Sequence, residues 1–100
     1  MVGSMLTRVP AGESLTVLSN RSGAALRLLV TAIDDAAAEI SAVGLPGSNA
    51  ACDSTGVSSL GLSGQSVLLR LDDGCALRVS ARGTVVALLR LQLEAVPFGR

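Results

Sequence analysis

Apolar and polar residues alternate most clearly in the second half of the chain. Over residues 77–82 the apolar side chains share one face of an extended strand, and two arginines and a serine share the other. The same period returns over residues 89–95 and over residues 66–71, and Asp72-Asp73-Gly74 supplies a turn whose glycine allows a positive φ. The pattern predicts three consecutive antiparallel strands that form a meander.

The first half of the chain is less regular. Residues 14–19 and 24–33 predict two strands, joined by a hairpin loop at Asn20-Arg21-Ser22-Gly23. Residues 36–43 fit either a strand or a short helix capped by one of the aspartates before it, and we favour a strand.

The middle of the chain and its start contribute no clear strand. Residues 46–64 are rich in glycine and small polar residues, which predicts a long loop. A chain of 100 residues is near the size of one domain, because two halves would be too small to bury a useful core. Residues 1–5 look like a cloning remnant, so we assign a single all-β domain to residues 6–100.

The composition limits the reactions and ligands that the chain can support. The chain has no histidine, tyrosine or lysine, so the commonest general bases and the commonest metal ligand are missing. We therefore expect no enzyme activity, no metal and no resident cofactor. The formal net charge is zero and Phe98 is the only aromatic residue, which makes nucleic acid an unexpected partner.

The two cysteines and the apolar runs bear on the compartment. Cys52 and Cys75 fit no zinc pattern, and we interpret them as reduced thiols, although their spacing also allows a disulfide. The apolar runs are far shorter than the about 20 residues of a membrane span, and the start lacks the features of a signal peptide. We expect a cytoplasmic protein without membrane insertion.

Several segments resemble the PilZ family of cyclic di-GMP signalling. Arg8-Val9-Pro10-Ala11 precedes the first predicted strand, Asp34-Asp35 follows the second, and residues 64–96 are similar to the closing meander of that family. The resemblance implies an antiparallel β-barrel of about six strands. It also implies that Arg8 and Asp34 bind cyclic di-GMP.

The departures from the PilZ pattern fall on its ligand motif. Ser4, Ala36 and Glu39 stand where the family has an arginine, a serine and a glycine. A missing guanidinium and an added carboxylate both disfavour a dianionic ligand. The resemblance thus implies a regulatory domain with weak or absent cyclic di-GMP binding, which acts on a protein partner or on the rest of a larger chain.

A second resemblance covers less of the chain. Met5-Leu6-Thr7-Arg8 with Gly12-Glu13-Ser14-Leu15 is similar to the opening of the CsrA family of RNA-binding translational regulators, and residues 26–46 are similar to its next two strands. The spacing after Arg8 is one residue too long, and a basic strand after Pro46 is missing. CsrA-like RNA binding is the alternative function.

Apolar content also predicts association. A domain this small that is 49% apolar leaves some leucine and valine side chains outside its core. Leu29 and Ile33 are predicted to point outward beside Leu18, and zero net charge gives little repulsion between such patches. We expect a homodimer or docking against a parent protein, with Leu18, Leu29 and Ile33 as the interface, unless residues 46–64 cover them.

Overall fold

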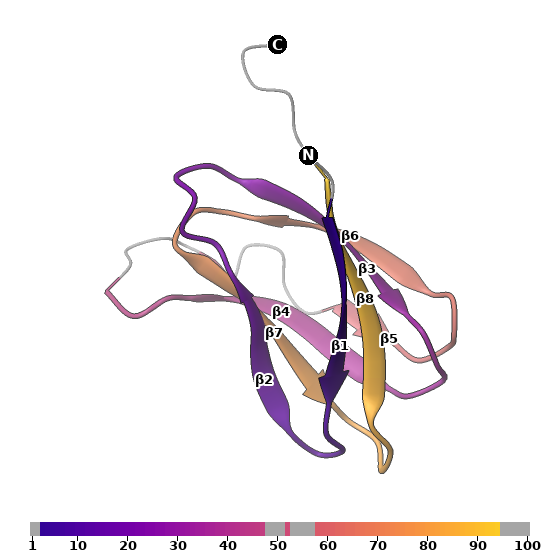
Figure 1. The fold of residues 1–100 in the computed structure, drawn as a ribbon. Coiled ribbons are helices and arrows are strands. Elements are labelled where there is room, and N and C mark those ends of the chain that lie inside the picture. The colour runs from indigo at the N-terminus through magenta and orange to yellow at the C-terminus, as the bar shows by residue number, and fades with distance from the viewer. Residues whose placement is uncertain (1–2, 48–51, 53–57, 95–100) are drawn as a thin grey trace.

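A computed structural model describes residues 3–47, 52 and 58–94. These residues form eight strands and no helix (Figure 1). The strands are β1 (Gly3–Val9), β2 (Ser14–Ser19), β3 (Leu26–Ala32), β4 (Ala38–Gly44), β5 (Ser58–Leu60), β6 (Ser66–Leu71), β7 (Cys75–Ala81) and β8 (Ala87–Glu94). The all-β prediction is confirmed, and so is the preference for a strand over residues 36–43.

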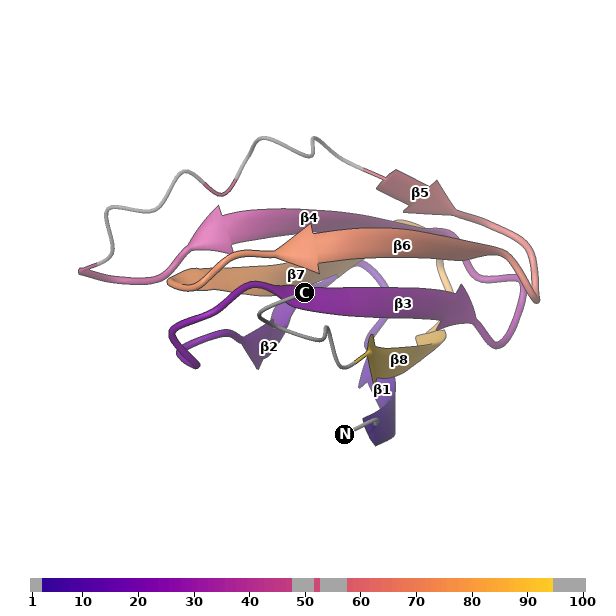
Figure 2. The ribbon, with the colours of Figure 1, turned by 90° about the horizontal axis from the view of Figure 1, so that it is seen from above.

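The strands form two antiparallel four-stranded sheets packed face to face. Sheet A has the order β1-β8-β3-β6 and sheet B has the order β2-β7-β4-β5. Every connection crosses from one sheet to the other except the one between β4 and β5. This interleaved order is that of a jelly-roll sandwich (Figure 2).

Three predictions of strand pairing are wrong. The two sheets do not close into a barrel of about six strands. β6, β7 and β8 do not form a meander, because β7 lies in sheet B and the other two are separated by β3 in sheet A. The expected hairpin of β2 and β3 is absent as well, since its two strands lie in different sheets. Alternation fixes which face of a strand is apolar, but it does not say which strand lies beside it.

The core lies between the inner faces of the two sheets. Leu77, Val79 and Ala81 of β7 point inward with at most 2% of their surface exposed, as the alternation predicts. Across from them, Leu28 and Val30 of β3 are completely buried. The core is built from leucine, valine, isoleucine, alanine and the two cysteines, and Phe98 lies outside the described residues.

Two strands lie in segments where the sequence predicted none. Residues 3–5, set aside as a remnant, form the start of β1 and pair with residues 91–93 of β8. β5 lies inside the predicted loop 46–64 and pairs with β4. Most of the remainder of that loop lies outside the described residues.

Candidate functional site

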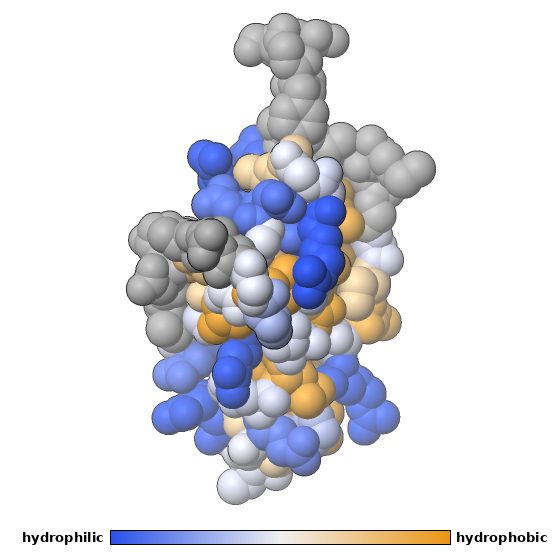
Figure 3. Space-filling view, turned by 90° about the vertical axis from the view of Figure 1, so that its left-hand side faces the viewer, coloured by the Kyte–Doolittle hydropathy of each residue, from blue (hydrophilic) through white to orange (hydrophobic). Residues whose placement is uncertain are grey.

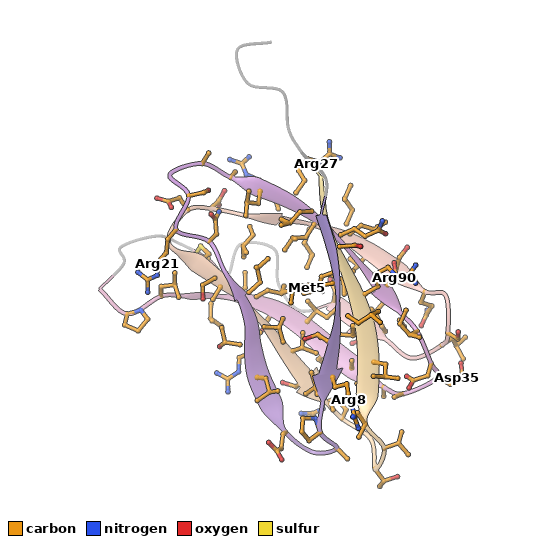
Figure 4. The ribbon with its side chains drawn as sticks, in the orientation of Figure 1. Met5, Arg8, Arg21, Arg27, Asp35 and Arg90 are labelled. Carbon is orange, nitrogen blue, oxygen red and sulfur yellow. A yellow bond between two sulfur atoms is a disulfide. The ribbon has the colours of Figure 1, made fainter. Side chains whose placement is uncertain are left out.

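The two residues predicted to bind cyclic di-GMP lie at the same end of sheet A. Arg8 is an exposed residue of β1 that pairs with Leu88 of β8 (Figure 4). Asp34 follows β3, where the backbone N–H of Ile33 donates to the carbonyl of Leu88 at 2.9 Å. β8 therefore lies between the strand of Arg8 and the strand that leads to Asp34.

The polar groups at and near Asp34 are engaged in local hydrogen bonds and an ion pair. Its Oδ1 accepts a hydrogen bond from the backbone N–H of Ala36 at 3.3 Å, and Ala36 itself is 4% exposed. Glu39, on the outer face of β4, forms an ion pair with Arg82 at 3.5 Å. Two of the three departures from the PilZ motif, Ala36 and Glu39, are thus a core residue and the partner of a surface arginine.

The three residues predicted as an interface do not share a face. Leu18 belongs to β2 of sheet B, and its half-buried side chain packs against the core. Leu29 is half-buried on the outer face of β3 in sheet A, and Ile33 follows that strand. The grouping failed because it assumed that β2 and β3 are hairpin partners.

The outer face of sheet B is polar, as expected for an antiparallel sheet that faces water. Ser14 of β2 and Ser80 of β7 share a hydrogen bond between their hydroxyls at 2.6 Å. Thr16 pairs with Arg78, which pairs in turn with Ser41 of β4. Short polar side chains and arginine thus cover this face.

The outer face of sheet A carries leucines instead. Leu6 of β1 is 68% exposed and Leu68 of β6 is 50% exposed. Leu88 of β8 and Leu29 of β3 are half-buried between them, and Leu29 pairs directly with Leu68. We call these four residues, one from each strand of sheet A, the leucine face.

Arginines separate the members of the leucine face. Arg90 of β8 pairs with Leu6 on one side and with Thr31 on the other. Arg27 and Arg70 pair with each other near the opposite end, where the Nε of Arg70 donates to Asp72 at 2.8 Å. Arg90 therefore interrupts the leucine face, and Arg27 and Arg70 border it.

A small apolar cavity lies between the sheets near β1 and β2. Its volume is about 150 Å³ and its lining is almost entirely aliphatic. The lining residues are Ser4, Met5, Leu18, Leu28, Leu91 and Leu93. Figure 3, seen from the left-hand side of Figure 1, shows apolar surface between polar areas above and below. A second hollow of about 370 Å³, around Leu6 and Arg90, is lined mostly by exposed side chains.

Asn20 organises the end of the sandwich where β2 and β6 end. It is 1% exposed, and its Nδ2 donates to the carbonyls of Ala24 and Leu71, both at 2.8 Å. Its Oδ1 accepts from the backbone N–H of Ser22 at 3.0 Å and from the hydroxyl of the same residue at 2.7 Å. The sequence indicated only a turn here, because nothing in it shows that this asparagine is buried.

Cys52 and Cys75 form a disulfide beside Asn20. The interpretation as reduced thiols is therefore wrong. Cys75 begins β7, and its carbonyl accepts the backbone N–H of Asn20 at 2.8 Å. The bond ties the β4–β5 connection to β7. This proximity follows from the pairing of β4 with β7, in which Gly44 lies opposite Cys75, and not from the spacing of the cysteines.

The described residues contain little that could do chemistry. Among residues 3–47, 52 and 58–94, no three histidine, cysteine, aspartate or glutamate side chains form a group that could hold a metal ion. Ser63 joins two loops, since its hydroxyl donates to the carbonyl of Ile33 at 2.9 Å and its N–H donates to Asp35 at 2.7 Å. No helix in this part of the chain is long and apolar enough to cross a membrane.

No protein-family model and no curated protein matches the chain. Solved structures resemble it in fold at very low identity. RmlC from Streptococcus suis, solved with dTDP-D-xylose, has a TM-score of 0.60 and 5% identity over 96% of this chain and 45% of its own. A protein of Bacillus endospore appendages, which form disulfide-linked pili, has a TM-score of 0.59 and 8% identity over 93% of this chain and 84% of its own.

A third similar structure is the CENP-C cumin domain of Drosophila melanogaster. Its TM-score is 0.54 at 13% identity, over 94% of this chain and 58% of its own. The chain spans less than half of the RmlC chain. These likenesses support the jelly-roll arrangement, and they extend to proteins as different as a sugar-nucleotide-binding protein and a pilus component.

Proposed function

We propose that this domain is a non-catalytic protein-contact module that self-associates through sheet A. The observation that carries the proposal is the leucine face. An antiparallel sheet that faces water normally alternates apolar inside and polar outside, and sheet B follows that rule. Sheet A departs from it on all four strands, with Leu6 and Leu68 at least half exposed.

The energetics favour covering this face. Full burial of one leucine side chain contributes about 1.5–3 kcal/mol, so partial burial of several leucines supplies a useful driving force. Leu29 and Leu68 are direct neighbours on this face, and exposed apolar surface of this kind commonly marks a protein interface. The formal net charge of zero leaves no long-range repulsion to keep two copies apart.

The missing residue types support a role without catalysis. Two of the similar structures are RmlC and a dTDP-4-dehydrorhamnose 3,5-epimerase, at 5% and 12% identity. The present chain has no histidine, tyrosine, lysine or tryptophan, so carboxylates are the only ordinary candidates for a general base. The carboxylates of Asp34, Asp35 and Glu39 already accept hydrogen bonds or an ion pair.

Small molecules and nucleic acid fit the surface less well. Ligand pockets commonly measure about 300–1,000 Å³. The aliphatic cavity of about 150 Å³ is below that range, and the larger hollow lacks a buried polar group to orient a ligand. Base stacking requires aromatic side chains, of which the chain has one.

Cyclic di-GMP binding and CsrA-like RNA binding remain predictions from sequence. Arg8 and Asp34 lie at one end of sheet A, which leaves the nucleotide open to test by calorimetric titration. Micromolar binding that is lost in Arg8→Ala would identify the domain as a cyclic di-GMP receptor. Tight binding of GGA-containing RNA would favour the CsrA alternative instead.

The disulfide bears on compartment and on the mode of assembly. Structural disulfides are typical of oxidising compartments, so the bond counts against the predicted cytoplasmic location. Both cysteines of the chain are used within it, so a covalent linkage of the kind named for the endospore pili is not part of the proposal.

Light scattering over a concentration series tests the proposal. We expect the intact chain to shift from monomer to dimer as its concentration rises through the micromolar range. Thr16→Gln, on the polar face of sheet B, serves as the control and should associate as the wild-type chain does. A chain that stays monomeric at millimolar concentration would overturn the proposal.

A further inference from the structure

β1 is an edge strand with one open side. Among the described residues its only hydrogen-bonded neighbour is β8. Figure 2 shows β1 at one margin of the molecule, beyond β2 of the other sheet, whereas β5 lies beyond β6 at the opposite margin. A further strand can therefore approach β1 without first meeting sheet B.

The other edges carry features that discourage pairing. β2 has an irregular register between Thr16 and Leu18, and β5 is only three residues long. Bulges and short length are two devices that protect edge strands. β1 has seven residues in continuous register with β8, no proline, and Arg8 as its single charge.

The sequence of β1 is complementary to itself in the antiparallel direction. Its outward residues are Ser4, Leu6 and Arg8, and pairing centred on Leu6 places the two leucines opposite each other. Each Arg8 then lies opposite the Ser4 of the other copy, so the two guanidinium groups are kept apart. On the inner side, Met5 faces Thr7 of the other copy, which covers a methionine that is 43% exposed.

Other pairings of the same strand are less favourable. Parallel pairing in register would place Arg8 directly opposite Arg8, and like charges in that position are destabilising. A shift by one residue would put the outward Leu6 of one copy opposite an inward residue of the other. Antiparallel registers centred on Met5 or Thr7 also keep both faces consistent, but they pair residues 3–7 or 5–9 alone. The arrangement about Leu6 pairs the whole strand, places the two leucines opposite each other and separates the charges.

β6, the other edge of sheet A, has a related outward pattern. Ser66, Leu68 and Arg70 repeat the order serine, leucine, arginine. Arg70 is already held by Asp72, and β5 extends past this edge (Figure 2). The observations therefore favour β1, and pairing through β6 is an outcome that the experiment distinguishes.

We infer that two copies of this chain pair through antiparallel β1 strands centred on Leu6. The inference rests on the proposed self-association and specifies its geometry. The two A sheets become one continuous eight-stranded sheet, since each copy contributes four strands. A two-fold axis passes between the Leu6 side chains and brings them into contact, and Leu6 is the most exposed member of the leucine face. The other three leucines of each copy stay on the outer face of the joined sheet.

Disulfide trapping tests this register. Cys52 and Cys75 are bonded to each other, so Leu6→Cys introduces the only free thiol. Directly opposite residues in an antiparallel pair have Cα atoms about 4.5–5.5 Å apart, within disulfide range. We expect Leu6→Cys to form covalent dimers under mild oxidation at least tenfold faster than Arg8→Cys, whose two thiols would lie far apart.

A mixture of Ser4→Cys and Arg8→Cys chains provides a second test that keeps Leu6. It should give cross-linked heterodimers, while each variant alone should give few homodimers. Cross-linking between Leu6→Cys and Leu68→Cys chains, or of Leu68→Cys alone, would overturn β1 pairing in favour of β6. Equal rates of disulfide cross-linking at every position would indicate random collisions and would also overturn β1 pairing.

Light scattering of the wild-type chain distinguishes a wrong β1 geometry from an absence of self-association. A wild-type dimer combined with no trapping at position 6 and none in the Ser4 and Arg8 mixture would overturn the β1 geometry and leave self-association standing. A wild-type monomer at all concentrations would overturn both.

Discussion

Asn20 shows how much of the structure can depend on one side chain. Its amide is buried and makes four hydrogen bonds, which connect β2, the following loop and the end of β6. Its backbone carbonyl also accepts the N–H of Gly74 at 2.8 Å, which positions the turn into β7. No described buried side-chain nitrogen or oxygen lacks a partner, and both polar atoms of this amide are bonded.

Asn20→Ala should lower the free energy of unfolding by about 2–4 kcal/mol, because it removes four hydrogen bonds, including the buried one to the carbonyl of Leu71. Urea denaturation with the disulfide intact measures the change. Ser22→Ala, which removes an exposed partner of the same amide, is the control and should cost about 1 kcal/mol or less. Equal losses in the two variants would show that the asparagine has no special role.

At the same scale, the sequence predicted inward and outward positions well. Leu77, Val79 and Ala81 of β7 and Leu89 and Leu91 of β8 point inward, while Arg78 and Arg90 point outward, as alternation requires. The prediction failed for Leu18. An irregularity between Thr16 and Leu18 in β2 reverses the alternation, so that Leu18 faces the cavity. An extra residue in a strand reverses the face of every later residue in that strand, and it leaves no mark in the period itself.

At the scale of elements, the strands were predictable and their partners were not. Six of the eight strands coincide with segments of predicted extended structure, and β1 and β5 were missed. β5 is too short to show a period, and residues 3–5 were set aside on grounds unrelated to periodicity. Pairing depends on contacts between residues far apart in the chain, and every short connection here could equally have closed a hairpin.

The disulfide anchors the β4–β5 connection, where the sequence analysis predicted only a loop. It joins Cys52 in the β4–β5 connection to the first residue of β7, across 23 positions. A cross-link that closes a loop of this length contributes about 3 kcal/mol by reducing the entropy of the unfolded chain. Reduction should therefore weaken the fold without removing any strand.

Reduction of Cys52–Cys75 should lower the free energy of unfolding by about 3 kcal/mol. Chemical denaturation with and without reductant measures the difference. The double variant Cys52→Ala with Cys75→Ala should show a similar loss and no further response to reductant. An unchanged free energy of unfolding after complete reduction would contradict a stabilising role.

At the scale of the whole molecule, the two outer faces have different character. Sheet B presents serine, threonine and charged side chains, whereas sheet A presents the leucine face and ends in the open edge of β1. Neither contrast was visible from composition, because it depends on which strands share a sheet. The expectation of surplus apolar surface came from the sequence, and its location comes from the topology.

Amide hydrogen exchange of β1 at low and high protein concentration tests the account most directly. Backbone N–H groups on the open side of β1 exchange freely in a monomer and become hydrogen-bonded when a second β1 pairs with them. We predict that exchange within residues 3–9 slows at least tenfold as the protein concentration rises, while β2 is unchanged. Exchange in β1 that is independent of concentration, in a sample that reaches millimolar protein, would contradict the account.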